Sequence, residues 1–476
     1  MKKLFVLAAS ALLLSACAKE NIKPNEPTDQ NGEIPLLEIG LNTTKTALGT
    51  EAAGKFPIVW SEGDEIAVID NMGVEGKQNI SVYRIKEGIG TDKGLFEHVS
   101  GDAFPNVIND VVYPASAVVP KSTFLSETLI TDVTKLVPKV QNQAYTKDSF
   151  DPKYAVMYFH RNSASDPIKL SPLSTIVCIP IKGFGDNDIV TSVRWQHMDG
   201  RTVDVTLNCH EGGVKLSKNQ ATNFYLSVPP TVAGNNTFNS IAYVYLKNGA
   251  VQVKTPRDRE RFEAGTLHRF PEWQLSKKAE WTIMDYGSQR NMATWKGIPL
   301  GPAYFMIDGN DLSWWESRRE LKTDNSGPKM AGPHTMVIDL GKAQTISTIK
   351  VKSKETDSSP LYGIVDNKGE DIYGKQSYNP PFTYHVAFAT EEPTEAVISS
   401  FIKNKTWPTG LTKKTFKCDV KIGMDSYYGK DKKSWWTVNA GGVEARYLFV
   451  HFEHSWNNDA DGTAAPFVKV AEFDIE

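Results

Sequence analysis

The residues whose types best suit a functional site lie between positions 304 and 315, in the sequence Tyr-Phe-Met-Ile-Asp-Gly-Asn-Asp-Leu-Ser-Trp-Trp. A short apolar strand runs into the Asp-Gly-Asn-Asp segment. These residues favour a tight turn, because Asp and Asn bond their own backbone and Gly allows positive φ. The two tryptophans that follow would point to opposite faces of a strand, so at most one can enter a given core. We predict that Trp314 packs inside the domain and that Trp315 is a candidate ligand contact.

Aromatic side chains in loops provide the chemistry of sugar binding. A flat ring can cover the apolar C–H face of a sugar, while nearby polar groups bond its hydroxyls. A tryptophan covering roughly 80–100 Å² of sugar surface would contribute about 2 to 2.5 kcal/mol. That contribution supports affinities near the millimolar to high-micromolar range for a single site. For each tryptophan the alternative is packing in a core or an interface. The candidate rings are Trp295, Trp315, Trp435, Trp436 and Trp456.

Polar residues near these rings could complete a binding site. Trp456 is the favoured ring because it lies in the polar, turn-forming stretch His-Ser-Trp-Asn-Asn-Asp at 454–459. His454 and Asn457 of this stretch are further candidate contacts. Arg318 and Arg319 could reach a carboxylate or a pair of hydroxyl groups. Together these residues predict a site for a glycan or a glycoprotein.

Residue patterns for catalysis are missing from the sequence. It contains no Gly-x-Ser-x-Gly, no His-Glu-x-x-His and no Walker-type phosphate loop. A glycosidase needs two carboxylates at a set separation in a cleft, and many Asp and Glu residues here could pair by chance. We predict a protein that is not an enzyme.

Length and composition favour a large β-rich protein. The 476 residues suggest about three domains. The 53 Lys and Arg nearly balance the 56 Asp and Glu, so bulk charge gives no reason to expect nucleic acid as a partner. The 35 Gly and 26 Pro, among frequent Thr, Val and Ile, favour short strands joined by turns. We therefore predict an all-β protein.

The N-terminus has the layout of an export signal. Lys2 and Lys3 precede an apolar run at 4–14 that is too short to span a bilayer. The sequence Leu-Ser-Ala-Cys at 14–17 resembles a bacterial lipobox, which implies cleavage after a signal peptide at 1–16 and acylation of Cys17. Ordinary signal cleavage with an unmodified cysteine is the alternative. With two or more acyl chains the membrane anchor would be stable, so we expect a lipoprotein on the cell surface, held in the outer membrane. Residues 17–32 are predicted to form a flexible tether.

The other cysteines do not form a recognisable scaffold. Cys178, Cys209 and Cys418 match no metal-binding spacing. Cys178 and Cys209 could pair, but buried free thiols are the preferred interpretation.

Residues 33–274 contain regularly spaced, short apolar runs that favour β-sandwiches. Five segments of this region resemble motifs of fimbrillin-like surface proteins, in the same order. The resemblance implies two tandem transthyretin-like β-sandwiches, at 33–165 and 166–274, and a role in a fimbrium. Trp60 is expected to be a core aromatic. The segments are Trp-Ser-Glu-Gly-Asp-Glu-Ile at 60–66, Val-Tyr-Pro-Ala at 112–115, Lys-Val-Gln-Asn-Gln at 139–143 before Tyr-Ala-Val-Met-Tyr at 154–158, Leu-Ser-Thr-Ile-Val at 173–177, and Phe-Glu-Ala-Gly-Thr-Leu-His-Arg-Phe at 262–270.

Departures from the fimbrillin pattern point to a particular role. Family members polymerise by donor-strand insertion, often after cleavage near an N-terminal arginine, but no arginine precedes Arg84. A further domain also follows where family shafts carry a donor strand. The resemblance therefore implies an accessory or tip subunit, with other fimbrial subunits as partners.

Residues 275–476 include a linker at 277–280 near their start and hold most of the tryptophans. This region resembles the discoidin domain, also called the coagulation factor V/VIII type C domain, which is an eight-stranded jelly-roll β-sandwich shared with many carbohydrate-binding modules. Insertions are expected at 353–383 and 400–440. The matching segments are Ile-Asp-Gly-Asn at 307–310 with Trp315, Val-Ile-Asp-Leu-Gly at 337–341, Ala-Arg-Tyr-Leu at 445–448 and Val-Ala-Glu-Phe at 470–473.

The discoidin resemblance also implies a possible metal site, because many sugar-binding members hold a structural calcium beside the Asp-Gly-Asn turn. Calcium takes oxygen ligands from carboxylates, hydroxyls and carbonyls. The corresponding positions here are Asp308, Asp311 through its carbonyl, Ser313 in place of the usual Thr, and Glu472. A metal-free turn is the alternative.

Two functions agree with these features. The first is cell adhesion by a fimbrial accessory or tip lipoprotein whose discoidin-like domain binds glycans. The alternative is a surface glycan-binding lipoprotein of a polysaccharide-uptake system, in which the fimbrillin-like body is a spacer.

Overall fold

The structure is a computed structural model in which parts of the chain are described. The predicted signal peptide, Cys17 and the tether at 17–32 lie outside these parts, and so does Cys418. Within them, no helix is long and apolar enough to cross a membrane. The described residues are 36–41, 59–70, 79–102, 109–118, 133–143, 150–163, 166–185, 188–198, 202–232, 239–254, 261–289, 293–295, 298–310, 313–317, 333–353, 381–417, 436–456, 464–465 and 469–476.

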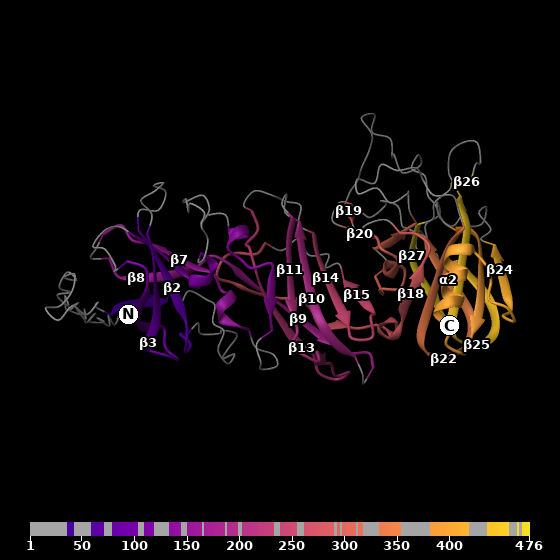
Figure 1. The fold of residues 1–476 in the computed structure, drawn as a ribbon, viewed down its shortest axis with the longest axis horizontal. Helices are drawn as coiled ribbons and strands as arrows, with labels where there is room; N and C mark the ends of the chain where they lie inside the picture. Colours follow the sequence, from indigo (N-terminus) through magenta and orange to yellow (C-terminus); the bar gives the residue numbers. More distant parts are fainter. Residues whose placement is uncertain are drawn as a thin grey trace, which may run out of the picture.

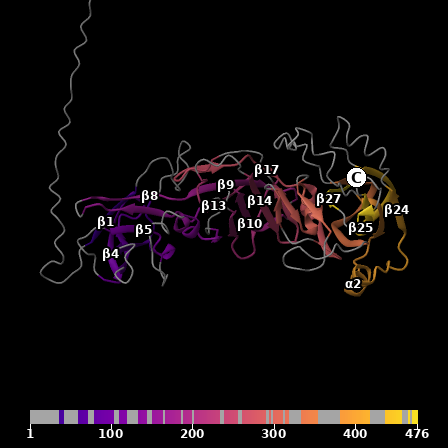
Figure 2. The same ribbon diagram turned by 90° about the horizontal axis from the view of Figure 1, so that it is seen from above.

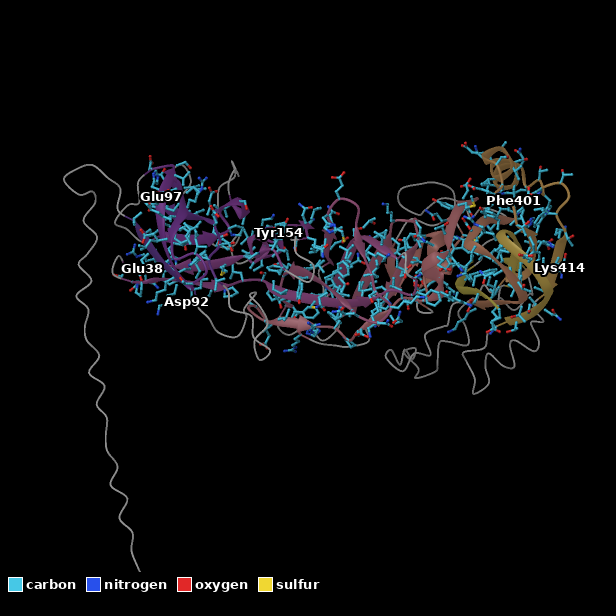
Figure 3. The ribbon with its side chains drawn as sticks, turned by 90° about the horizontal axis from the view of Figure 1, so that it is seen from below. Glu38, Asp92, Glu97, Tyr154, Phe401 and Lys414 are labelled. Atoms are coloured by element: carbon cyan, nitrogen blue, oxygen red, sulfur yellow. The ribbon has the colours of Figure 1, made fainter. Side chains whose placement is uncertain are left out.

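Three β-rich units follow one another in a row (Figures 1 and 2). We call them the barrel, the central sandwich and the C-terminal domain. Figure 3 shows Glu38 and Glu97 of the barrel at one end of the row and Phe401 and Lys414 of the C-terminal domain at the other. The row therefore separates the N-terminal strands from the predicted ligand-binding domain by the length of the molecule.

The barrel is a closed sheet of strands in the order β1-β4-β3-β2-β5-β7-β8. β1 pairs antiparallel with β4 and parallel with β8, and these pairings close the sheet. Trp60 lies inside, 4.8 Å from the Phe96 ring and 5.5 Å from the Tyr113 ring, which confirms its predicted place in a core. The elements are β1 (Leu37–Leu41), β2 (Glu65–Asp70), β3 (Asn79–Glu87), β4 (Lys93–Ser100), β5 (Asn109–Tyr113), β7 (Met157–His160), β8 (Ile168–Pro172) and the 3-10 helices η1 (Ala115–Ala117), η2 (Val133–Lys135) and η3 (Pro152–Tyr154).

The central sandwich packs a six-stranded sheet, β15-β14-β10-β11-β6 with β12 beside β10, on a second sheet, β13-β9-β16 with β17 beside β9. Apolar side chains from both sheets share one core, in which Trp195 lies 4.7 Å from the Phe270 ring. The strands are β6 (Val140–Asn142), β9 (Thr175–Lys182), β10 (Ile189–Met198), β11 (Thr202–Asn208), β12 (Val214–Lys215), β13 (Thr222–Val228), β14 (Asn239–Leu246), β15 (Val251–Lys254), β16 (Leu267–Arg269) and β17 (Trp273–Gln274).

The C-terminal domain is built around two long strands, β22 and β25. β22 bends near Gly341 and β25 at Gly441 and Gly442, where positive φ angles of 79°, 79° and 70° suit glycine. Side chains before and after each bend enter one core, so the strands fold around it as a sandwich. The strands are β18 (Thr282–Tyr286), β19 (Ala293–Trp295), β20 (Ile298–Gly301), β21 (Trp314–Glu316), β22 (His334–Ser353), β23 (Pro381–Ala389), β24 (Lys413–Lys417), β25 (Trp436–Trp456), β26 (Ala464–Ala465) and β27 (Lys469–Ile475).

Helices play a minor part in this domain. The helix α2 (Glu395–Asn404) covers the outer face of its sheet, where Phe401 packs on Phe449 with ring centroids 5.2 Å apart. Thr394 caps the helix by accepting a hydrogen bond from the Val397 amide. The 3-10 helices are η4 (Lys277–Glu280), which connects the central sandwich to the domain, and η5 (Ala303–Met306).

Several predictions can be compared with this architecture. The mostly-β class is confirmed, whereas the identity of the first two units as transthyretin-like sandwiches stays a prediction. The first unit closes into a barrel, and its strand β8 begins beyond the predicted boundary at 165. β6, by contrast, lies before that boundary and pairs with β11 of the central sandwich, so the chain exchanges strands across it. Cys178 and Cys209 are both free thiols.

Candidate functional site

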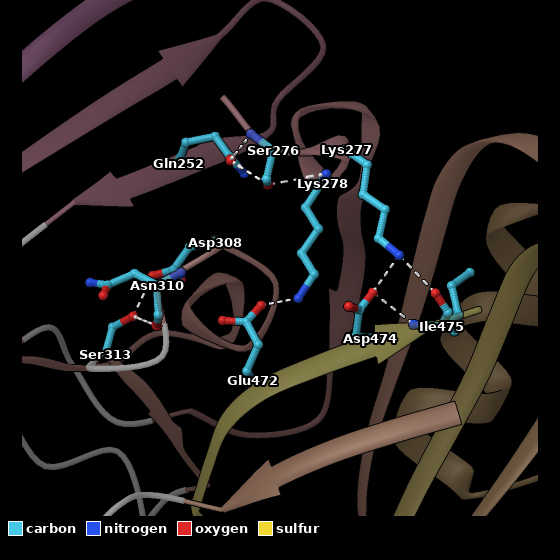
Figure 4. Close-up of polar contacts among 10 residues, drawn as sticks. All are labelled: Gln252, Ser276, Lys277, Lys278, Asp308, Asn310, Ser313, Glu472, Asp474 and Ile475. Atoms are coloured by element: carbon cyan, nitrogen blue, oxygen red, sulfur yellow. Dashed lines mark hydrogen bonds and ion pairs between the residues drawn. The ribbon is translucent and has the colours of Figure 1, made fainter. Parts of the chain in front are cut away.

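The Asp308 turn is a compact network of local hydrogen bonds (Figure 4). Asp308 Oδ1 accepts a hydrogen bond of 2.8 Å from the Asn310 amide, and its Oδ2 lies 2.6 Å from the Ser313 hydroxyl. Ser313 Oγ also lies 2.8 Å from the Asn310 carbonyl oxygen. Gly309 between them has a φ of 77°, which the turn requires. The sequence prediction of a tight turn is therefore confirmed.

Two residues from distant parts of the chain lie beside this turn. Glu472 comes from β27 and Lys278 from η4, and the Lys278 ammonium contacts Glu472 Oε1. Their side chains are only 5% and 4% exposed, so this ion pair is buried. The neighbouring Lys277 forms a more exposed pair with Asp474, at 2.9 Å. Glu472 was predicted from the sequence as a site residue, but its lysine partner was not.

Burial sets the electrostatics of Asp308. Loss of solvent raises the pKa of this carboxyl well above its usual range, and the charge of Glu472 raises it further. The bonds from Ser313 and Asn310 and the charge of Lys278 oppose this effect only in part. A hydroxyl has one hydrogen to donate. A protonated Asp308 lets Ser313 accept from the carboxyl and donate to the Asn310 carbonyl, which satisfies both contacts.

The residues at this turn do not fit a calcium ion. Calcium prefers six to eight oxygen ligands, several of them charged. Here both Asp308 oxygens are engaged by the turn itself, and the Glu472 carboxylate contacts an ammonium group. Across the described parts of the chain, no three His, Cys, Asp or Glu side chains form a group that could hold a metal ion. Asp311, the fourth predicted ligand, lies outside the described residues.

Trp315 is not placed to contact a ligand, so this prediction is wrong. Its side chain has 0% exposure and belongs to the main core of the C-terminal domain. The indole Nε1 donates a hydrogen bond of 3.1 Å to the Ser288 carbonyl, and the ring lies 5.5 Å from that of Phe452. Trp314 is buried as predicted. The two rings point to opposite faces of β21, and both faces are covered.

The remaining candidates can be located only through their backbones. Trp295 ends β19, Trp436 begins β25, and Trp456 ends β25, where it pairs with Ala464 of β26. Trp456 is thus the last residue of a strand, not part of a loop as predicted. The side chains of these residues and of His454 are outside the description, as are the residues Arg318, Arg319, Trp435 and Asn457.

Strand pairing gathers several of these positions at one end of the C-terminal domain, which we call the loop end. Pro381 pairs with Ser455 beside Trp456, and Trp436 pairs with Val351 near the end of β22. Trp315 contacts both sets of strand ends, the one near Trp456 and the one near Trp436. Its backbone pairs with Val470, next to Ser353, and its ring contacts Phe452 of β25. Trp436 and Trp456 therefore lie at the same end of the sandwich, above a buried Trp315.

A further cluster, which was not predicted from the sequence, lies on the outer face beside α2. The rings of His451 and Trp407 stack with centroids 5.5 Å apart and 2° between their planes. His385 bonds Thr415 at 2.8 Å through Nδ1, and its Nε2 lies 2.5 Å from Glu453. Burial, and next the charge of His385, lowers the pKa of His451 to about 4. Polar residues at alternate positions of β23 and β25 were the available signal.

Comparisons with known proteins place a similarity in the C-terminal region. No family model matches the chain, and no curated protein does. Several similar solved structures cover 42% of this chain, among them two carbohydrate-binding modules and the C-terminal domain of a chitobiase. At such identities and scores, the similarity identifies no ligand and no binding residue here. One of the similar structures is the C-terminal domain of a chitobiase from Bacteroides fragilis, at 15% identity over 96% of that chain with a TM-score of 0.25. Another is a family 32 module from a family 31 glycoside hydrolase of Clostridium perfringens, at 12% identity over 93% of that chain with a TM-score of 0.26. A third is the family 32 module of C. perfringens NanJ in complex with galactose, at 15% identity over 95% of that chain with a TM-score of 0.23.

Proposed function

We propose that this chain is a non-enzymatic cell-surface lipoprotein adhesin that binds glycans through the loop end of its C-terminal domain. The observation that best supports this proposal is that the strand ends at Pro381, Trp436 and Trp456 converge over one packed sandwich. A rigid core beneath such an end can hold aromatic rings in fixed positions, which reduces the entropy lost when a sugar binds.

The row of three units supports a role in presenting this domain. The barrel, which carries the N-terminal strands, and the C-terminal domain lie at opposite ends (Figures 1 and 2). A lipid anchor at Cys17, before the barrel, would hold the loop-bearing domain away from the membrane. This geometry suits an adhesin at a fimbrial tip, with the fimbrillin resemblance of residues 33–274 as the reason to expect fimbrial partners.

A closed barrel favours a second candidate function. Donor-strand assembly requires a sheet edge that can accept a strand from another subunit, whereas β1 and β8 pair and close this barrel. A barrel without a free edge would serve as a spacer. The protein would then capture glycans at the cell surface for polysaccharide uptake, with the same binding domain.

A glycan array probed with the purified full chain tests the shared part of both functions. We expect retention of one class of glycan, weakened about 30- to 70-fold by Trp456→Ala, the loss expected for a ring worth about 2 to 2.5 kcal/mol. Phe184→Ala is the matched control, because Phe184 is an exposed aromatic of the central sandwich. If the intact chain retains no glycan at any concentration tested, the proposal is lost.

Co-purification separates the two functions. Retention of fimbrial subunits on the tagged chain supports the adhesin, and binding of a soluble polysaccharide without fimbrial contact supports uptake.

A further inference from the structure

We infer that the ammonium group of Lys278 is the structural cation of the C-terminal domain, so that this domain folds without a divalent metal. The discoidin resemblance predicts calcium beside the Asp308 turn, and the structure has a lysine of the same chain there instead. The folding and the metal content of the domain can both be measured without any glycan.

The contacts at the turn leave little for a metal to coordinate. Glu472, the predicted ligand farthest along the chain, contacts the Lys278 ammonium in a buried pair. Both carboxyl oxygens of Asp308 are engaged within its own turn, one by the Asn310 amide and the other by the Ser313 hydroxyl. Replacing the ammonium by an ion would require Lys278 to leave, and its buried side chain would then need a new location.

The backbone of Lys278 is held in place by the central sandwich. Its amide bonds Ser276 Oγ at 3.3 Å, and Ser276 in turn donates to Gln252 of β15 at 2.8 Å. The next residue, Ala279, is fully buried in the core of the central sandwich, and its carbonyl accepts from Asn248. Lys278 therefore reaches Glu472 from a fixed starting point, as Figure 4 shows.

Lys278 also connects the central sandwich to the C-terminal domain, which a metal ion bound within one domain would not do. The Asp308 carbonyl accepts a hydrogen bond of 3.3 Å from the Val253 amide of β15, and Phe305 packs with Tyr243 and Val253 of the central sandwich. The cation, the turn and the interface thus belong to one buried region. Removal of the ammonium should loosen the junction as well as the C-terminal domain.

The first experiment uses the unaltered full chain. Its thermal unfolding is followed in excess EDTA and in millimolar calcium chloride, and the metal content of the protein is measured by elemental analysis. We expect the same unfolding midpoint in both solutions and no stoichiometric calcium. A lower midpoint in EDTA, or one calcium per chain, would overturn the inference.

The second experiment removes the ammonium. Lys278→Met removes the ammonium group that contacts the buried Glu472 carboxylate, so we expect the midpoint to fall by roughly 10 °C. Lys277→Met is the matched control, because the adjacent lysine makes a more exposed pair with Asp474 and should cost far less. Equal effects of the two substitutions would contradict the inference.

A third variant keeps the test decisive if Lys278→Met fails to fold. In Asp308→Asn, the amide oxygen can accept from the Asn310 amide, and the amide NH2 can donate to Ser313. A metal-free turn should therefore tolerate this change with a midpoint shift of about 2 °C or less. A calcium site would lose a charged ligand and most of its stability. If Asp308→Asn lowered the unfolding midpoint strongly and added calcium restored it, Lys278 would not be the structural cation.

Discussion

Two tight turns, at Asp64 in the barrel and at Asp308 in the C-terminal domain, each place an aspartate beside a glycine but have different surroundings. Each turn contains a glycine with positive φ, 81° at Gly63 and 77° at Gly309. In both, burial is the largest cause of a raised aspartate pKa. Asp64 is held by the Ser61 amide at 2.7 Å and the Tyr113 hydroxyl at 2.9 Å, all within one barrel.

The Asp308 turn differs because charged residues from two other segments meet it. Glu472 and Lys278 lie far from Asp308 in the sequence, and Lys278 belongs to the connection with the central sandwich. The aspartate turn of the barrel thus makes its contacts within one unit, whereas the turn at Asp308 lies where two units meet. The surroundings of the turn, more than its own residues, decide which of these it does.

The largest effect should come from the buried tryptophan next to each turn. Trp60→Ala and Trp315→Ala should each lower the free energy of unfolding by about 3–5 kcal/mol, because both remove a large ring from a packed core. Urea denaturation measures this, with Phe184→Ala as an exposed control that should change stability by about 0.5 kcal/mol or less. If Trp315→Ala abolished glycan retention without changing stability, Trp315 would be a ligand contact after all.

An intermediate effect distinguishes a local turn from a connecting one. Asp64→Ala removes the acceptor of the Tyr113 hydroxyl and should lower the free energy of unfolding by about 1–3 kcal/mol. Hydrogen exchange should rise in the barrel strands β2 and β5 and stay unchanged in β27. Lys278→Met should instead increase exchange in both β15 and β27. Increased exchange throughout the chain for Asp64→Ala would remove the distinction.

The smallest effect is a change in pH dependence. Both aspartates have folded-state pKa values raised above 3.8, so the folded state holds their protons more tightly than the unfolded state. Their contribution to stability is full below pH 3.8 and is lost as pH rises through the folded pKa. Asp308→Asn and Asp64→Asn should each flatten this decline, and Asp308→Asn more strongly. Urea midpoints measured across the acidic range check this, and a steeper decline in either variant would contradict it.

Much of the fold could be predicted from the sequence because its signals are local. Short apolar runs bounded by Gly, Pro and Asp marked the strands, and the Asp-Gly-Asn segment marked the turn at Asp308. Trp60 was also expected to be a core aromatic, and it is buried. The helix α2 was missed, although Thr394 is a good cap and Val397 and Phe401 are spaced for one helical face.

The candidate site was harder to predict because it depends on which strands meet. The alternating direction of side chains along a strand indicated that Trp314 and Trp315 face opposite ways, but it did not indicate that both faces of β21 are covered. The partner of Glu472 could not be identified either, since Lys278 stands among several lysines of the connecting segment. His385 and His451 come together only because β23 pairs with β25.

The sequence alone determined the β class, the tight turns and the clustering of tryptophans in the C-terminal region, because these depend on residues within a few positions of one another. The tertiary structure decided that the first unit closes as a barrel, that Trp315 is a core residue and that Lys278 contacts Glu472. Each of these outcomes depends on contacts between residues far apart in the chain. These long-range contacts depend on how all the strands pack their apolar faces together, so they cannot be predicted from any single segment.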